Sequence, residues 1–204
     1  MLTRTKRDGI RTPLKGFSIG RTVEIPQPSF EKFVNSTGRK IGKLAIIKAA
    51  TNMHLTLMES RPVREAFIEK RGSDHAAMQN FAYWMVSELD GFNDHKGSVT
   101  VNPDRKVDLF GTRRDKLAIC ISPDEQMLNE RALIEEMLRD EFGDLPKIQD
   151  FDPHITIGRV HNDRLTREQR RNPELILNGT GNILPERIVM NGLSGYLNGR
   201  SMRP

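Results

Sequence analysis

The chain has a single cysteine, few aromatic residues and no long apolar run. Cys120 is the only cysteine among 204 residues, so an intramolecular disulfide and a cluster of thiolate metal ligands are both excluded. It lies in the apolar run 117–121, which indicates a buried strand and a packing role. The apolar stretches are too short to cross a bilayer, and no apolar segment follows the basic N-terminus. We therefore expect no membrane partner, no export and a cytoplasmic location.

Length and charge set the broad class of the protein. A chain of 204 residues suits one domain, and its net charge of +5 favours an anionic partner such as a nucleotide or nucleic acid. Residues 1–21 are polar and basic and predict a loose N-terminal segment. We expect residues 22–204 to form a single bilobal domain, and we favour a monomer.

Two short segments repeat the same pattern of residue types. His54-Leu55-Thr56-Leu57 and His154-Ile155-Thr156-Ile157 each place a histidine and a threonine two residues apart between aliphatic residues. Side chains two apart in a strand point to the same face, so each segment would present an imidazole and a hydroxyl on one face and bury its aliphatic residues on the other. The chain has five histidines, and two of them falling in this pattern by chance is roughly a one-in-a-thousand event at ordinary residue frequencies.

These four side chains suit the cleavage of a phosphodiester without a metal ion. One histidine can accept a proton from the nucleophile and the other can protonate the leaving oxygen, since an unperturbed imidazole titrates near neutral pH. The hydroxyls of Thr56 and Thr156 can donate hydrogen bonds to the non-bridging phosphate oxygens. Each motif offers one good metal ligand with no second ligand at suitable spacing, so we expect neither a metal nor another cofactor.

The remaining patterns predict alternating strands and helices on either side of each motif. Strands are expected at 22–25, 43–48, 53–58, 98–101, 107–110, 117–121, 154–160 and 188–190. Helices are expected at 29–34, 60–71, 74–89 and 166–171, and a further helix opens with a capping box at 122–125 and is closed by Gly143. The order of elements suggests two pseudo-repeats of about one hundred residues, each with one motif on an inner strand.

On these residues the chain resembles the 2H phosphoesterase superfamily, which includes the LigT-type RNA 2′,3′-cyclic phosphodiesterases and the 2′-5′ phosphodiesterases. The family has two His-x-Thr/Ser-x motifs, matched here at His54/Thr56 and His154/Thr156. The run from Pro153 to Arg159 resembles the extended second motif, in which the arginine contacts the phosphate. Strand alternation brings Arg159 to the face of His154 only if the strand bulges at Gly158 or the arginine side chain curls back.

The resemblance implies an α+β fold in which two pseudo-symmetric antiparallel sheets flank a cleft, with helices outside. It implies an RNA-processing hydrolase of RNA 2′,3′-cyclic phosphate ends or 2′-5′ oligonucleotides. By family analogy, His154 activates the nucleophile and His54 protonates the leaving group. Two alternatives stay open: an enzyme of the phage anti-CBASS type that hydrolyses cyclic oligonucleotide second messengers, and a nucleotide-binding module without turnover. An aromatic side chain that stacks on a base is not identified by the sequence, with Tyr83, Phe92, Phe110 and Tyr196 as candidates.

Overall fold

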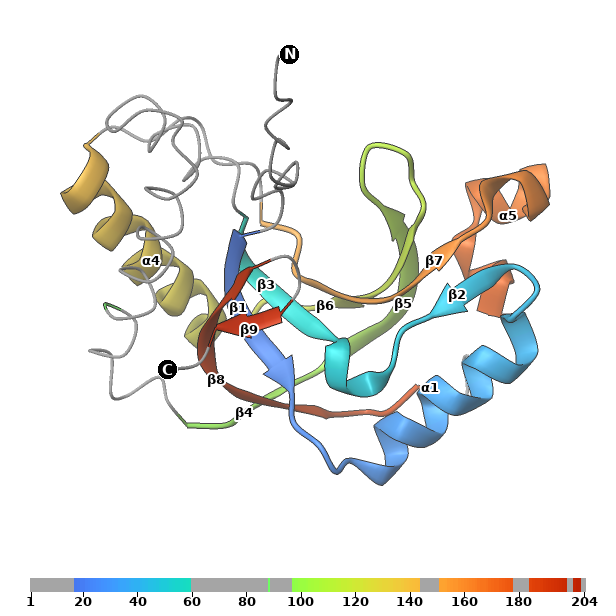
Figure 1. The fold of residues 1–204 in the computed structure, drawn as a ribbon, viewed down its shortest axis with the longest axis horizontal. Helices are drawn as coiled ribbons and strands as arrows, with labels where there is room; N and C mark the ends of the chain where they lie inside the picture. The colour runs from blue at the N-terminus through green and yellow to red at the C-terminus, as the bar shows by residue number, and fades with distance from the viewer. Residues whose placement is uncertain are drawn as a thin grey trace, which may run out of the picture.

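The computed structural model describes residues 17–59, 88, 97–143, 151–177, 184–197 and 200–202 (Figure 1). Its strands are β1 (Phe17–Val23), β2 (Ala45–Ile47), β3 (His54–Glu59), β4 (Val99–Val101), β5 (Pro103–Phe110), β6 (Lys116–Ile121), β7 (His154–Val160), β8 (Ile188–Leu197) and β9 (Arg200–Met202). Every strand pairing among them is antiparallel. Each strand expected from the sequence has a counterpart. The first, expected at 22–25, lies at 17–23, and those expected at 107–110 and 188–190 are longer than expected.

Helices lie at both ends of the sheet. The described helices are α1 (Pro28–Ile41), α4 (Glu125–Phe142), α5 (Arg167–Arg171) and the 3-10 turns η1 (Ala50–Asn52), η3 (Asn162–Arg164) and η4 (Pro173–Leu177). α4 lies at one end, near β1 and β8, while α1 and α5 lie at the other, near β2 and β7 (Figure 1). Within the described ranges, no helix is long and apolar enough to cross a membrane. The helix expected at 60–71 falls outside the described residues, as does the one at 74–89 except for Glu88, which is helical.

The strands form one continuous hydrogen-bonded sheet. Its order is β4-β8-β1-β3-β7-β6-β5, with β2 also beside β7 and β9 beside β8. The antiparallel α+β architecture expected from the sequence is therefore present, but the two expected sheets are joined. The junction is narrow, because β3 and β7 share a single residue pair in register, Leu55 with Ile155. This pair divides the sheet into a half with β4, β8, β9, β1 and β3 and a half with β7, β6, β5 and β2.

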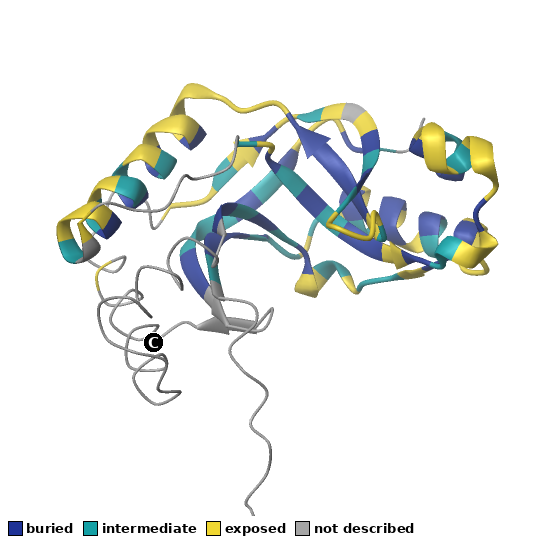
Figure 2. Ribbon diagram, turned by 90° about the horizontal axis from the view of Figure 1, so that it is seen from above, coloured by how far each residue is buried: buried dark blue, intermediate teal, exposed yellow. Residues whose placement is uncertain are grey.

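The core lies between the sheet and the apolar faces of the helices. Leu55 and Leu57 of β3 and Ile155 and Ile157 of β7 are all buried, as the alternation in both motifs predicts. Figure 2 shows the buried positions running along the inner strands, with exposed positions on the outer sides of the helices. Helix α1 contributes its apolar stripe to this core, made of Phe30, Phe33, Val34 and Ile41.

The first strand contains a charged residue that is fully buried. β1 begins at Phe17. Residues 17–21, which were expected to belong to the loose N-terminal segment, are therefore part of the sheet. Arg21 is only 1% exposed and its Nε donates to Oε2 of Glu130 on α4 at 3.0 Å. Its Nη1 donates to the backbone oxygens of Gly97 and Asn191, both at 2.9 Å. The sequence did not predict that this polar segment is a buried strand, because Glu130, the partner of Arg21, lies 109 residues away in the chain.

Helix α4 begins two residues after the expected start. Asp124 is its N-cap, and the carboxylate accepts a hydrogen bond from the backbone N–H of Met127 at 2.8 Å. The hydroxyl of Ser122, expected to cap the helix, donates instead to the side chain of Asp104. Gly143 closes the helix with φ of 76°, as expected of a residue at this position.

The buried ion pair predicts a large loss of stability when one charge is removed. Glu130→Gln keeps the volume but leaves the guanidinium of Arg21 buried without a counter-charge, which costs about 3–5 kcal/mol of unfolding free energy. Urea denaturation measures this cost. Glu136→Gln, on an exposed position of the same helix, is the matched control and is expected within about 0.5 kcal/mol of the wild type. Equal midpoints for the two variants would contradict the role assigned to the pair.

Candidate functional site

The two motifs lie side by side on neighbouring strands. Leu55 and Ile155 are the middle residues of the two motifs, and they pair directly across the antiparallel junction between β3 and β7. In this register Thr156 lies opposite His54, and His154 lies opposite Thr56. The two histidines and two threonines therefore alternate around one point of the sheet, and each histidine faces the threonine of the other motif.

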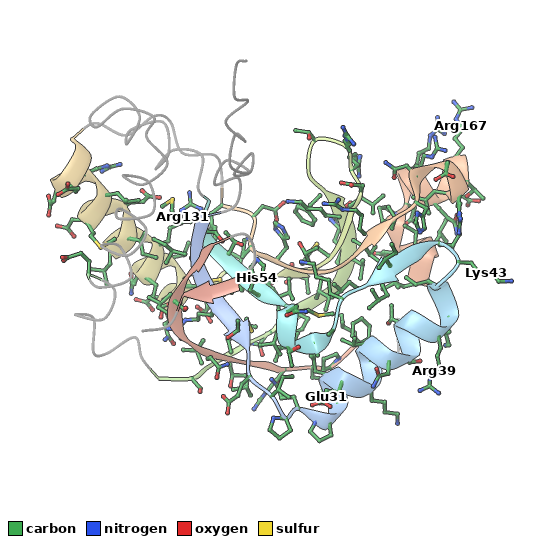
Figure 3. The ribbon with its side chains drawn as sticks, in the orientation of Figure 1. Glu31, Arg39, Lys43, His54, Arg131 and Arg167 are labelled. Atoms are coloured by element: carbon green, nitrogen blue, oxygen red, sulfur yellow. The ribbon has the colours of Figure 1, made fainter. Side chains whose placement is uncertain are left out.

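All four motif side chains share one face of the sheet. Arg21 pairs with Leu55 and reaches α4, so α4 covers the face on which Leu55 lies. His54 and Thr56, on either side of Leu55, point to the opposite face and are partly exposed. Figure 3 shows His54 on β3 near the middle of the sheet, where the two halves meet. The motif face is thus the one that can receive a ligand.

The surroundings of His54 disfavour its charged form. Burial is the main cause and the charge of Lys48 the second, with smaller contributions from His154 and Lys116, and together they lower the pKa of His54 to about 4. A backbone hydrogen bond to Asn52 acts in the opposite direction. The imidazole of His54 is therefore neutral at neutral pH and carries a lone pair that can accept a proton.

His154 is held by a backbone acceptor and an aromatic ring. Its Nδ1 lies 2.8 Å from the backbone oxygen of Asp152. Because a carbonyl only accepts, Nδ1 carries the hydrogen, and Nε2 is the nitrogen that exchanges a proton. The ring of Phe110 stacks on the imidazole with centroids 3.9 Å apart and an interplanar angle of 14°. Asp152 thus orients His154 through its backbone, and Phe110 fixes the plane of the ring.

A bulge at Gly158 brings Arg159 to the face of the histidines. Ala118 pairs with Thr156 but Leu117 pairs with Gly158, so β7 has one extra residue at this point. Ile157 and Gly158 are consecutively buried, and Arg159 is exposed on the face of His154. Of the two routes considered from the sequence, the bulge is the one observed.

Glycine is needed at the bulge because a neighbouring strand passes close to it. A Cβ on Gly158 would lie 2.7 Å from the backbone oxygen of Ile46 and 2.8 Å from Cδ1 of Ile47, both on β2. On the other side of the site, a Cβ on Gly20 would lie 1.9 Å from the backbone oxygen of Leu55. Each motif strand therefore has a glycine at a point of close backbone approach, Gly158 within β7 and Gly20 on β1 beside β3.

Two lysines near the motifs were not identified from the sequence. Lys48 follows β2, and its backbone N–H donates to the oxygen of Ile157 at 2.9 Å. Lys116 opens β6 and pairs with Arg159. The pKa of Lys48 is lowered, first by burial and then by the like charges of Lys116 and Arg159. No local pattern could have revealed these residues, because strand pairing alone brings them to the motifs.

Cys120 and the aromatic residues considered for base stacking were also singled out from the sequence. Cys120 pairs with His154 in register, and burial raises the pKa of its thiol to about 11, so the thiol stays protonated at neutral pH and serves in packing. Among the four aromatic candidates for base stacking, Phe110 is the one that the structure places beside a motif histidine. Tyr83 and Phe92 lie outside the described residues, as does the side chain of Tyr196. Within the described part of the chain, no three His, Cys, Asp or Glu side chains are grouped as metal ligands.

The fold is similar to solved structures of low sequence identity. Escherichia coli LigT in its apo form matches with a TM-score of 0.50 at 14% identity, covering 94% of each chain. A conserved protein of unknown function from Agrobacterium tumefaciens matches with a TM-score of 0.50 at 13% identity, covering 93% of this chain and 84% of its own. LigT complexed with ATP matches with a TM-score of 0.48 at 14% identity, covering 92% of each chain. No protein-family model and no curated protein matches the chain.

The fold expected from the resemblance is therefore confirmed, because the chain shares the fold of Escherichia coli LigT. The similarity to LigT extends along almost the whole chain and is not confined to the two motif segments. At 14% sequence identity the similarity shows the fold alone, so the chemistry of the site depends on the residues that this chain places there.

The electrostatic environment of His54 generates a direct prediction. Lys48→Gln removes a nearby cation, so protonation of His54 becomes easier and its pKa rises from about 4 toward the ordinary value of 6.5. The pKa stays below 6.5, because burial is the larger cause and is unchanged. An NMR titration of the histidine ring resonances measures the shift. Lys43→Gln, at an exposed turn far from His54 (Figure 3), removes the same charge and should leave this pKa unchanged. A pKa that is the same in wild type and Lys48→Gln would contradict this account.

Proposed function

We propose that the chain is a metal-independent phosphodiesterase that cleaves nucleotide phosphodiester bonds, at RNA 2′,3′-cyclic phosphate ends or at 2′-5′ linkages. The observation that carries the proposal is the register of the two motifs, in which Leu55 pairs with Ile155. It supports a single phosphate bound between His54 and His154, with one histidine on each side of the phosphorus. An acid and a base on opposite sides of one phosphorus are what displacement at that atom requires.

The environment of the histidines favours His54 as the base. With a pKa of about 4, its imidazole is neutral at neutral pH and ready to accept a proton from water or from a ribose hydroxyl. The oxygen of that nucleophile attacks phosphorus, the bond to the leaving oxygen breaks, and the leaving oxygen takes a proton from the imidazolium of His154. This assignment is the reverse of the one that family analogy suggests. The negative charge of a bound phosphodiester raises the pKa of His54 in the complex and brings it closer to the working pH.

The threonines supply the charge stabilisation at the scissile phosphate, and Arg159 adds positive charge beside it. Thr56 and Thr156 flank the same point of the sheet, and each hydroxyl can donate to a non-bridging oxygen where negative charge develops. Arg159, brought to this face by the bulge, adds a positive charge at the edge of the site. Its Nε lies 3.3 Å from the carboxylate of Asp115, which orients the guanidinium. The basic net charge of +5 suits a nucleic-acid substrate.

Turnover of a substrate panel in excess EDTA tests the proposal. The panel holds adenosine 2′,3′-cyclic phosphate, 2′-5′-linked ApA and a 3′-5′ cyclic dinucleotide. We expect the wild type to cleave at least one of the first two, and the double variant His54→Ala/His154→Ala to lose at least about 10⁴-fold in rate, since each proton transfer contributes about 10²–10⁴. Each Thr→Ala change is expected to cost about 2–4 kcal/mol of transition-state stabilisation.

The outcomes separate the proposal from its alternatives. Cleavage of the cyclic dinucleotide alone would indicate a hydrolase of second messengers. Stabilisation of the folded protein by nucleotides without any product would indicate a binding module, and activity that EDTA abolishes would contradict metal independence. Full activity in the Thr56→Ala/Thr156→Ala variant would contradict the anchoring role of the threonines. Circular dichroism of each variant shows that a loss of rate is not a loss of fold.

A further inference from the structure

Three cationic side chains lie together beside the motifs. Arg159 pairs with Ile46 of β2 on one side and with Lys116 of β6 on the other, so these three residues form one row on the face of the histidines. Lys48 lies two residues after Ile46 and therefore on the same face. The like charges of Lys116 and Arg159 lower the pKa of Lys48, which places the three cations within electrostatic reach of one another. We call Lys48, Lys116 and Arg159 the cation cluster.

The charge of the cation cluster is not balanced by the part of the protein that the structure describes. Arg159 has one carboxylate neighbour, Asp115. Within the described ranges, neither Lys48 nor Lys116 forms an ion pair, although Lys48 is half-buried. A half-buried ammonium group without a counter-charge is unfavourable. An anion bound at this position would relieve both the burial of Lys48 and its repulsion by the other two cations.

The cation cluster is displaced from the point where the scissile phosphate would bind. That phosphate would lie by the Leu55–Ile155 pair, among the four motif side chains. Arg159 lies three residues after Thr156 on β7, and one of these residues is the extra residue of the bulge. At about 3.3 Å per residue, the cation cluster therefore begins about 7–10 Å from Thr156 along the strand. The offset is comparable to the spacing of neighbouring phosphates along a nucleotide chain. The exposed side chain of Ile46, in the same row, offers an apolar contact for a base or sugar.

We propose that Lys48 and Lys116, with Arg159, form a second phosphate subsite, so that the preferred substrate carries a further phosphate one nucleotide away from the bond that is cleaved. The inference rests on the proposed function and narrows its substrate class to nucleotide chains or terminally phosphorylated nucleotides. Lysine suits this role because its ammonium group acts as a point charge that accepts a phosphate in many orientations. The preference for substrates that carry the further phosphate is also expected to weaken as the salt concentration rises, because Lys116 is exposed and salt screens its charge.

Matched substrates with and without a 5′-phosphate test the subsite. The pairs are adenosine 2′,3′-cyclic phosphate with its 5′-phosphorylated form, and 2′-5′-linked ApA with pApA. We expect kcat/KM of the wild type to be at least tenfold higher for the phosphorylated member of the pair that it cleaves. Lys116→Gln should bring this ratio close to one, whereas Lys43→Gln, which removes the same charge at the distant turn, should keep it (Figure 3). Equal kcat/KM within each pair in the wild type, or a ratio that survives Lys116→Gln, would overturn the inference.

The same ligands separate failure of the subsite from failure of the proposed function. If the wild type cleaves no member of either pair, the proposed function fails, and titration calorimetry with the same four compounds then decides on the subsite. At least tenfold tighter binding of the 5′-phosphorylated compounds, lost in Lys116→Gln, supports the subsite without turnover. Equal dissociation constants within each pair, or no binding at all, overturn it.

Discussion

The single backbone pairing of Leu55 with Ile155 is the contact on which the site depends. It joins the two halves of the sheet, and it sets the register in which each motif histidine faces the threonine of the other motif. A slip of one residue would turn either motif from the ligand-facing side to the core, because strand side chains alternate. The burial of the aliphatic residues in both motifs opposes such a slip. The core thus fixes the geometry that the proposed chemistry needs.

Charge is distributed differently on the two faces of the sheet. On the face covered by α4, the guanidinium of Arg21 is fully buried and neutralised by Glu130. On the motif face, Lys48 and Lys116 have no such partner among the residues described, and the charge of Lys48 contributes to the low pKa of His54. The first arrangement stabilises the fold, whereas the second leaves a positive potential that an anionic ligand can neutralise. This contrast supports the proposal that the motif face binds the anionic substrate.

The sequence predicted what depends on local periodicity and missed what depends on pairing between distant strands. The spacing of His54 and Thr56 was enough to place them on one face, and Gly143 was enough to end a helix. The face of Arg159 depended on a bulge that Gly158 permits but does not require. The start of β1 was not predicted, because the charge of Arg21 is neutralised by Glu130 of α4, more than a hundred residues away in the chain. Lys116 and Phe110 come beside the motifs through the order of strands, which no local pattern encodes.

The central claim is that both histidines act on one phosphate, and an NMR titration with inorganic phosphate in excess EDTA tests it most directly. The ring resonances of His54 and His154 are followed in the same sample, with His161, outside the motifs, as an internal reference. The account predicts that both motif histidines shift with one dissociation constant and a stoichiometry of one phosphate per chain. A response of only one of them, or two different dissociation constants, would contradict a shared site.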